Sequence, residues 1–377
     1  MDDEIALVTT LMAAEDTGNP FWTADGVARS LNRARIVELP GAPVEAGILG
    51  HTAYELLSAA AIESLVRDAA ESLGLDPRHP NPLGDFDRYF ADPRTSAAAE
   101  SIAGIAGRRL GALLLMLSRG NPANRAARPD WNDAHWAFWA RVRQVILGGG
   151  LMAGELGRRM TAEARRFLAA SGSALDASVS NYGAHVTLVG LARCAPEDAR
   201  QMLLFDFGQT NVKRGRAIYR AGLLSRIELA PSLASPDAGS AFTPEAAREQ
   251  WAAMWPMIAA RWEEEVGRAD RRRTAIGLAL ATHLNDGHPF PTDRGRYGRL
   301  QLLGPRLACF LRDSLAERLG TYRAFVLLHD GLAAATAYAG ARRAAVLTLG
   351  TAIGAGYVPS AAGLRPHEEG LALLRDY

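Results

Sequence analysis

The chain has 377 residues, of which 48% are hydrophobic and 22% are charged, as in an ordinary water-soluble globular protein long enough for two domains. Its formal net charge of +1 predicts no electrostatic attraction to nucleic acid or to an acidic membrane. The two cysteines, Cys194 and Cys309, lack metal-ligand spacing, so the sequence predicts neither a disulfide framework nor a zinc knuckle.

The amino-terminal region carries few structural signals. Residues 1–4 are acidic and lack the positive region of a signal peptide, and no apolar run reaches membrane-spanning length, so we expect a cytoplasmic protein. Prolines and glycines break residues 1–50 into short pieces, and residues 24–39 are compatible with a helix and a strand. Residues 23–31 match a DNA-binding helix-turn-helix poorly, because the flanking helices and a basic surface are missing.

Helical periodicity appears over residues 54–73 and again over residues 96–117, where small residues permit close helix packing. A strand, a triple-glycine turn and a helix start follow over residues 142–154, with Gly148, Gly149 and Gly150 at the turn. Glycines let a backbone approach a nucleotide closely, and the helix N-terminus favours negative charge. The segment is either an adenosine or α-phosphate contact or a plain strand-to-helix loop.

Residues 203–215 contain a buried strand, a tight turn and a returning strand. Gly208 would let backbone N–H groups approach a phosphate, Thr210 can donate its hydroxyl, and Asp206 is placed to hold a magnesium ion through water. The alternative is an ordinary hairpin with a solvated Asp. Lys213 is the only lysine in the chain, and its ammonium faces either nucleotide phosphates or solvent.

The following segments provide two candidates for a general base. Residues 244–266 are helical, with tryptophans that we assign to a core, and a buried strand over 274–282 leads into a polar loop over 284–298. That loop contains Asn285 and Asp286 in a surface-turn composition. Asp330 instead ends a strongly apolar strand before an alanine-rich helix, where partial burial can tune a base, so it is the better candidate.

A second strand, Gly-Thr turn and strand occupy residues 344–358, with Gly350, Thr351 and Gly354 in and after the turn. Together with the segments around Asp206 and Asp330, this pattern resembles the two phosphate motifs and the catalytic-Asp motif of the actin-like ATPase superfamily. Within it, the chain resembles the ROK (repressor, open reading frame, kinase) family of sugar kinases over roughly residues 51–358.

The resemblance implies an α/β, two-lobed ribonuclease-H-like fold and ATP-dependent phosphorylation of a hexose or hexose-like hydroxyl, with Mg²⁺ and a small-molecule sugar as partners. Asp330 would be the base, and His329 with Asn285 and Asp286 would face the sugar. The two Gly-Thr turns would hold the β- and γ-phosphates from two sides with Lys213, Asp206 would organise magnesium, and Gly148 to Gly150 would take the adenosine. A homodimer is compatible with the helical faces, without a specific interface.

The order of the motifs differs from that family, in which the first phosphate motif opens the chain. Here the triple glycine comes first, and the second phosphate motif is close to the carboxy terminus, so we expect a circular permutation. Residues 186–192 resemble the closing segment of the family's carboxy-terminal lobe. The expected division is residues 1–200 as the adenosine-side lobe, 201–340 as the first-phosphate and sugar-side lobe, and 341–377 as the hairpin that returns to the first lobe.

Several positions depart from the family pattern. Gln209 replaces the usual second glycine, His329 stands where the family has Asn, and the zinc-binding cysteine cluster is absent. Ile48 stands where the sugar motif has Glu, so we expect a structural role for His51. These departures leave a second hypothesis open, a non-catalytic protein of the same fold that binds a sugar or a nucleotide.

Overall fold

The computed structural model describes residues 5–9, 19–237, 239–291 and 296–375. The chain divides into two units, which are described separately. Unit 1 contains residues 1–16, 185–340 and 358–377, and unit 2 contains residues 17–184 and 341–357. The chain therefore enters each unit more than once.

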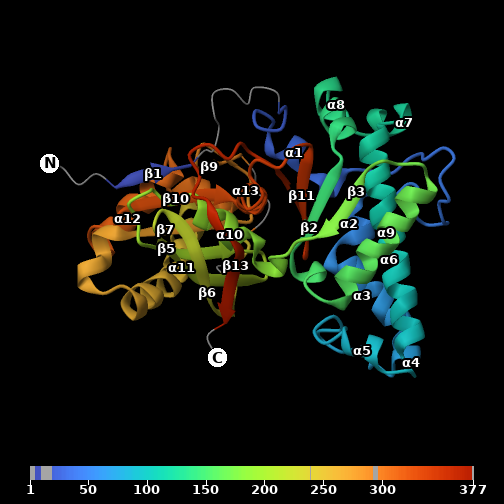
Figure 1. The fold of residues 1–377 in the computed structure, drawn as a ribbon, viewed down its shortest axis with the longest axis horizontal. Coiled ribbons are helices and arrows are strands. Elements are labelled where there is room, and N and C mark those ends of the chain that lie inside the picture. Colours follow the sequence, from blue (N-terminus) through green and yellow to red (C-terminus); the bar gives the residue numbers. More distant parts are fainter. Residues whose placement is uncertain (1–4, 10–18, 238, 292–295, 376–377) are drawn as a thin grey trace. The chain divides into compact units, whose positions relative to one another are not determined.

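The centre of unit 1 is a sheet of seven strands in the order β1-β10-β7-β4-β5-β6-β13 (Figure 1). Strand β4 pairs antiparallel with β5, and β5 with β6, whereas β4, β7, β10 and β1 run parallel, as do β6 and β13. The strands are β1 (Ala6–Val8), β4 (Gln201–Phe207), β5 (Asn211–Arg220), β6 (Leu223–Ala234), β7 (Thr274–Leu280), β10 (Ala324–His329) and β13 (His367–Arg375). The predicted α/β class is thus confirmed.

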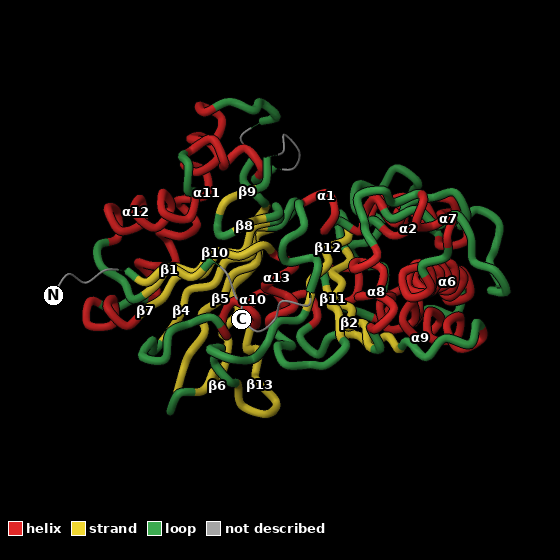
Figure 2. The backbone as a smooth tube through the Cα atoms, turned by 90° about the horizontal axis from the view of Figure 1, so that it is seen from above, coloured by secondary structure: helices red, strands yellow, loops and turns green. Residues whose placement is uncertain are grey.

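Helices cover both faces of this sheet (Figure 2). Apolar side chains of α11 (Pro244–Glu265) and α12 (Leu307–Leu319) pack on one face, and they include the buried Trp251 and Trp262. The predicted core role of the helix tryptophans is confirmed for these two. The short helices α10 (Val186–Arg193) and α13 (Asp330–Thr336) contact β7 from the opposite face.

The helices α10 and α13 lie in unusually close contact. A Cβ on Gly190 would stand 1.6 Å from the carbonyl oxygen of Ala333, so only glycine permits this approach. The guanidinium of Arg193 also donates to the carbonyls of Thr336 and Ala337, at 2.9 and 3.1 Å, and so satisfies the last turn of α13. This contact fixes the helix whose first residue is Asp330.

Unit 2 has a four-stranded sheet in the order β12-β11-β2-β3. Its strands are β2 (Gln144–Gly148), β3 (Asp176–Val179), β11 (Ala344–Leu349) and β12 (Ile353–Tyr357). Only the β11–β12 pair is antiparallel. The predicted strand before the triple glycine and the predicted strands on either side of Gly350 are therefore present. Residues 341–357 return to the unit formed by residues 17–184, as expected.

Two long helices, α6 (Ser96–Arg119) and α9 (Glu155–Ala170), pack together in unit 2. A Cβ on Gly107 would lie 2.6 Å from the carbonyl oxygen of Met160, so the small residues of α6 do permit close packing. By length and composition α6 could cross a membrane, contrary to the expectation that no apolar run is long enough. It is mostly buried within the unit, however, as in a soluble protein.

The predicted helix over residues 54–73 is divided into α2 (Ala53–Leu57), α3 (Ala59–Asp68) and α4 (Ala70–Leu73). Ser58 ends α2 in an extended conformation and caps α3 by accepting from the N–H of Ala61. Residues 24–39 contain the one-turn helix α1 (Gly26–Arg29) and, instead of a strand, an isolated bridge between Arg35 and Thr52. The remaining helices of unit 2 are α5 (Arg88–Ala91), α7 (Pro122–Ala126) and α8 (Asp133–Arg141).

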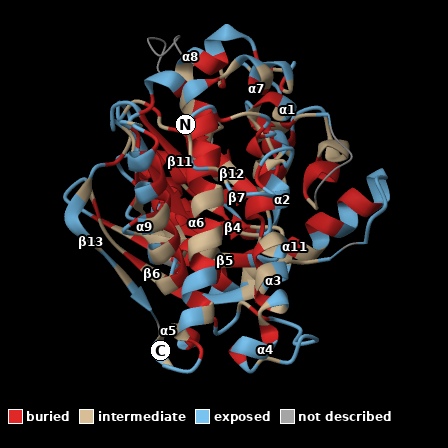
Figure 3. Ribbon diagram, turned by 90° about the vertical axis from the view of Figure 1, so that its right-hand side faces the viewer, coloured by how far each residue is buried: buried red, intermediate tan, exposed pale blue. Residues whose placement is uncertain are grey.

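The unit boundaries differ from the predicted division at three places. Strand β1 belongs to unit 1, because it pairs with β10. Residues 185–200 belong to unit 1, because α10 packs on β4, β5 and β7. Residues 358–377 belong to unit 1 as well, because β13 pairs with β6 and does not continue the hairpin β11–β12. Most side chains along β13 are exposed (Figure 3). The sequence of this strand therefore lacks the apolar pattern that would predict a buried strand.

Candidate functional site

Three parallel strands of unit 1 end at the same edge of its sheet. Phe207 at the end of β4 pairs with Leu280 at the end of β7, and Leu280 pairs with His329 at the end of β10. The residues that follow these strands therefore share one edge, which is where open α/β sheets place their ligands. Asp206 and Asp330, the two carboxylates selected from the sequence, both lie at this edge.

Asp206 forms a buried ion pair with Lys213. These residues face each other across the antiparallel pair β4–β5, and Lys213 Nζ lies 2.9 Å from Asp206 Oδ2. The Asp206 side chain is 4% exposed. Burial raises the pKa of Asp206, while Lys213 and a hydrogen bond from the Thr187 hydroxyl oppose that rise. Of the two environments predicted for Lys213, open solvent is therefore excluded.

The ammonium of Lys213 is stabilised as a cation. Burial alone would lower its pKa, but attraction to Asp206 and to Asp330 outweighs that effect and raises the pKa above 10.5. One lysine thus bonds to the carboxylate of Asp206 and is also stabilised by the charge of Asp330. The hypothesis of a solvated Asp206 in an ordinary hairpin is wrong, because this carboxylate is buried and paired.

The turn after Asp206 is held by its own side chains and by neighbouring hydroxyls. The N–H of Gly208 bonds to the Asn211 carbonyl at 3.1 Å, and the Gly208 carbonyl accepts from Ser235 Oγ at 2.7 Å and from Tyr297 Oη at 3.2 Å. Thr210 is exposed next to them. The backbone N–H of Gly208 is therefore already used within the turn.

Gln209, the residue that replaces the usual second glycine, connects this turn to the adjacent strand end. Its Nε2 donates to the carbonyl of Ala281 at 2.8 Å, and its Oε1 accepts from the N–H of Arg296 at 3.3 Å. The N–H of Ala281 in turn donates to the Phe207 carbonyl at 3.1 Å. The substitution thus adds hydrogen bonds that fix the turn against the segment after β7.

Asp330 is the first residue of α13, and its side chain is 26% exposed. Its Oδ1 lies 3.0 Å from Nε2 of His329 and accepts from the N–H of Gly331 at 2.7 Å. Burial would raise the pKa of this carboxyl, but His329, His283 and the Gly331 bond outweigh that effect and lower it. Asp330 is therefore an ionised carboxylate at neutral pH.

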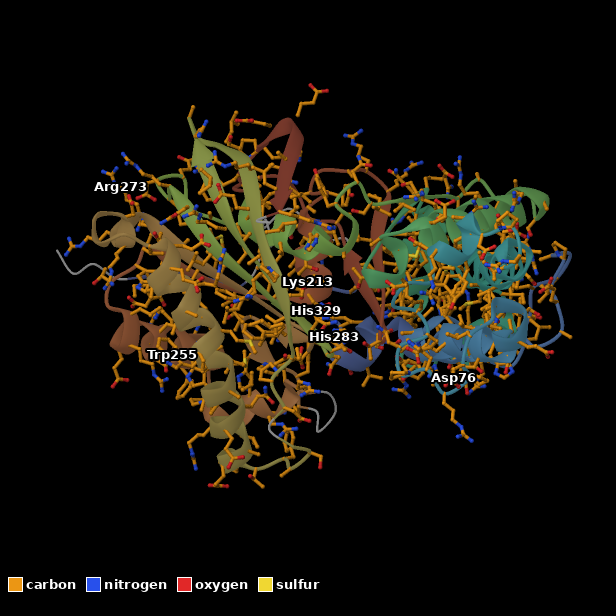
Figure 4. The ribbon with its side chains drawn as sticks, turned by 90° about the horizontal axis from the view of Figure 1, so that it is seen from below. Asp76, Lys213, Trp255, Arg273, His283 and His329 are labelled. Atoms are coloured by element: carbon orange, nitrogen blue, oxygen red, sulfur yellow. The ribbon has the colours of Figure 1, made fainter. Side chains whose placement is uncertain are left out.

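Two histidines, both labelled in Figure 4, stack on each other, and one of them, His329, contacts this carboxylate. The ring centroids of His283 and His329 are 4.4 Å apart, with 29° between the ring planes. His185, which precedes α10, also approaches Lys213. Burial, together with Lys213 and Arg375, lowers the pKa of His185 to about 4, so its imidazole is neutral at neutral pH.

Sequence reasoning missed three members of this cluster, His185, Thr187 and His283. His283 offered a usable signal, because it follows a buried strand at the same edge as the Asp330 strand. His185 and Thr187 lie before β4 in the chain, and only the packing of α10 against the sheet brings them to Asp206 and Lys213.

Asn285 and Asp286 form a small surface hairpin of β8 (Leu284–Asn285) and β9 (His288–Pro289). Both are exposed, Asp286 has a positive φ of 47°, and its Oδ1 accepts from the Thr9 hydroxyl at 2.6 Å. The predicted contact of these two residues with a substrate is not supported by this placement. Residues 292–295 of the predicted polar loop lie outside the described residues.

The glycines of unit 2 serve different purposes. Gly149 has φ +94°, and a Cβ there would stand 2.4 Å from the Leu349 carbonyl oxygen, so this glycine is required by packing against β11. A Cβ on Gly150, by contrast, would meet nothing within 4 Å. Gly148 ends β2 opposite Thr348. Gly150 thus has open space at the position where a side chain would be.

That open space is a hollow of about 490 Å³ between residues 83–88 and residues 150–156. Its size is in the range of small-molecule sites. Nothing in the sequence marked residues 83–88 as part of a site, because this segment is distant in the chain and carries no glycine-rich motif of its own.

The N-terminus of α9 does not offer a free anion site as predicted. The Asp87 carboxylate accepts from the N–H groups of Glu155 and Leu156 at 2.7 and 3.0 Å. Gly154 permits this approach, since a Cβ there would stand 2.0 Å from an Asp87 oxygen. The negative charge that the helix favours is supplied by the chain itself, so these two N–H groups are not open to the predicted α-phosphate.

The second Gly-Thr turn joins β11 to β12. Gly350 has open space where a side chain would be, and its carbonyl accepts from the N–H of Ala59 at 2.7 Å. Thr351 is exposed. Gly354 packs against Thr348, because a Cβ there would stand 2.2 Å from the Thr348 hydroxyl oxygen, which would have to move.

His51 takes part in local structure. Its carbonyl accepts from the N–H of Ile36 at 3.0 Å, and its half-exposed ring lies 3.9 Å from Glu55. This is consistent with the structural role expected for it. Among the residues that the structure describes, no group of three or more His, Cys, Asp or Glu side chains gathers as a metal site.

A scan against protein-family models finds no match for this chain, and a search of curated proteins also finds no match.

Proposed function

We propose that this protein is an ATP-dependent kinase that phosphorylates a hydroxyl of a hexose or hexose-like sugar, with Asp330 as the general base. The observation that carries the proposal is the convergence of Asp206, Lys213 and Asp330 at one edge of the unit 1 sheet. Phosphoryl transfer needs a positioned base and positive charge near the phosphate; at this edge Asp330 is the candidate base, and Lys213, which is paired with Asp206, is the cation.

The order of the strands supports a ribonuclease-H-like fold. The five strands β6-β5-β4-β7-β10 form an antiparallel three-stranded meander continued by two parallel strands, with the first strand of the meander in the centre. The strands β12-β11-β2-β3 repeat this arrangement without a third meander strand. Because β2 and β3 precede β11 and β12 in the chain, the proposed fold is circularly permuted.

In the proposed reaction, Asp330 accepts the proton of the attacking hydroxyl. Its lowered pKa keeps it ionised at neutral pH, and both of its hydrogen bonds among the described residues fall on Oδ1, which leaves Oδ2 for the acceptor. In the turn after Asp206 the N–H of Gly208 is already bonded, so the exposed Thr210 would contact the phosphate, and Lys213 would supply positive charge to it.

The donor set also fits a magnesium ion, which binds through one or two carboxylates and its waters. Asp206 is a buried carboxylate and would hold the ion through water, as Lys213 already occupies its Oδ2. Bound Mg²⁺ would supply further charge neutralisation to the phosphates. Unit 2, taken by itself, has room for a small molecule in the hollow at Gly150, and its turn at Gly350 and Thr351 is a candidate anion contact of that unit.

One observation favours a non-catalytic binding protein of the same fold. Asp206 is already neutralised by Lys213, and the N-terminus of α9 is already filled by Asp87, so two predicted ligand positions have internal partners. A protein that binds a sugar or a nucleotide without phosphoryl transfer would tolerate both arrangements. Turnover separates this hypothesis from the kinase.

The test is release of ADP from ATP and Mg²⁺ over a panel of hexoses and N-acetylhexosamines. Asp330→Asn keeps the size of the side chain and removes the base, so we expect sugar-dependent ADP release to fall by about 10²- to 10⁴-fold. Asp313→Asn is the matched control, because this exposed aspartate on α12 takes the same substitution and lies in none of the proposed contacts. No sugar-dependent release by the wild type, with ATP still bound, would instead support the binding protein.

A further inference from the structure

We propose that His283 is a positioning residue for Asp330, which acts by stacking on His329 and holding the Asp330 carboxylate in line with the first phosphate turn. This inference rests on the proposed function, since it assigns a role to a residue beside the proposed base. It concerns a side chain that no motif in the sequence marked.

The first step is the contact between the two imidazoles. The rings of His283 and His329 are nearly parallel, 4.4 Å apart, and the His329 side chain is 10% exposed. A ring held between a stacked neighbour and the strand end has little rotational freedom. His329 Nε2 can therefore remain 3.0 Å from Asp330 Oδ1, as a donor with its proton on that nitrogen.

The second step is what fixes His283 itself. The segment that carries it, residues 281–283, is bonded at three points. The N–H of Ala281 donates to Phe207, the carbonyl of Ala281 accepts from Gln209, and the carbonyl of His283 accepts from the N–H of Phe290 at 3.1 Å. Two of these bonds come from β4 and the turn after it. The position of His283 is thus tied to that of the turn.

The third step is the path from turn to base. The turn residue Gln209 holds the 281–283 segment, His283 stacks on His329, and His329 bonds to Asp330. A base must lie within hydrogen-bond reach of the hydroxyl that attacks a phosphate, so the distance between base and phosphate turn has to be maintained. This chain of contacts maintains it where the Asn of the family pattern is missing.

The charged groups around Asp330 come from four elements. His329 lies at the end of β10, His283 after β7, Lys213 on β5 and Asp206 on β4. The two histidines lower the pKa of Asp330. Removal of His283 should therefore raise the pKa of Asp330 as well as loosen its position, and these effects can be measured separately.

The experiment compares His283→Ala with His283→Phe. Alanine removes both the stack and the ring nitrogens, so we expect an about tenfold lower kcat and a raised Asp330 pKa, with KM for the sugar little changed. Phenylalanine keeps a flat ring, so kcat at the pH optimum should stay within about twofold of the wild type, while the Asp330 pKa still rises. His367→Phe on the exposed strand β13 is the control for the same exchange.

The Asp330 pKa is read by ¹³C NMR of the aspartate carboxyl carbons in the free protein, with Asp330→Asn to assign the signal. This reading needs no turnover. An Asp330 titration that is the same in the wild type and His283→Ala would overturn the inference even if the protein is a kinase. A shifted titration in a protein that phosphorylates no sugar would support the positioning contact and reject the kinase. If His283→Ala does not fold, the His283→Phe titration decides alone. This variant keeps a stacked ring and lacks the ring nitrogens, so an unshifted Asp330 titration would show that the His283 imidazole does not act on the carboxylate.

Discussion

The buried ion pair between Lys213 and Asp206 is the interaction whose loss we expect to affect stability most clearly. In Lys213→Met the stem of the side chain is kept and the ammonium is removed, which leaves a carboxylate that is 4% exposed without its partner. Breaking a buried pair in this way costs about 3–5 kcal/mol. Because Asp206 keeps its bond from Thr187 and the Lys213 side chain is 23% exposed, we expect the lower end, about 3 kcal/mol.

The assay is urea unfolding of the wild type, Lys213→Met, Asp206→Asn and the double variant. The double variant contains no uncompensated charge at this pair, so it should be more stable than Lys213→Met by at least about 1 kcal/mol. In thermal unfolding, about 3 kcal/mol corresponds to a fall in Tm of roughly 6–12 °C for a unit of 150–250 residues.

The pH dependence has a definite sign. Without Lys213, burial holds the folded-state pKa of Asp206 further above its unfolded value, so the penalty is present at high pH and declines as the pH falls through that pKa. The difference between the wild type and Lys213→Met should therefore be smaller at about pH 5 than at about pH 8. A loss below about 1 kcal/mol that is independent of pH, with no recovery in the double variant, would refute the reasoning.

The single lysine allows a direct check of the same pair. Protein labelled with ¹⁵N-lysine has one Nζ resonance, and its titration should lie above the usual 10.5 because Asp206 and Asp330 raise the pKa.

Three further predictions concern a glycine pair, a helix cap and the proposed base. Gly149→Ala should destabilise the protein by about 1–3 kcal/mol, because Gly149 has a positive φ and a Cβ there would meet the Leu349 carbonyl. Gly150→Ala should unfold like the wild type and should weaken ATP binding in calorimetry. Equal stabilities of the two variants would contradict the packing role of Gly149. Asp87→Ala should cost about 0.5–2 kcal/mol in urea unfolding through loss of the α9 cap, and an unchanged midpoint would exclude that role. The pKa of Asp330 is lower in the folded protein than in the unfolded chain, so the carboxylate stabilises the fold above its unfolded-state pKa and this contribution is lost as the pH falls through its folded-state pKa. Asp330→Asn should therefore remove part of the loss of stability measured below about pH 4. Identical acid unfolding curves of the two proteins would argue against it.

Sequence patterns were sufficient for the elements that place the candidate site. The apolar runs that end at Asp206 and His329 are buried strands, and the Gly-Thr turn at Gly350 does join two antiparallel strands. These predictions succeed because a strand buried on both faces must be apolar along its whole length, and a tight turn needs particular residues. The preference for Asp330 over Asp286 also agrees with their surroundings, one at a parallel strand end and the other on a surface hairpin.

What the sequence by itself determined is thus the α/β class, the main strands and the residues at their ends, since these depend on local periodicity and turn chemistry. Only the tertiary structure decided which side chains meet there. Lys213 bonds to Asp206, His283 stacks on His329, and Asp87 fills the N-terminus of α9 because strands and loops distant in the chain are brought together. Such contacts depend on strand order and helix packing, which no local pattern encodes, and they determine how each carboxylate is charged and what remains open to a ligand.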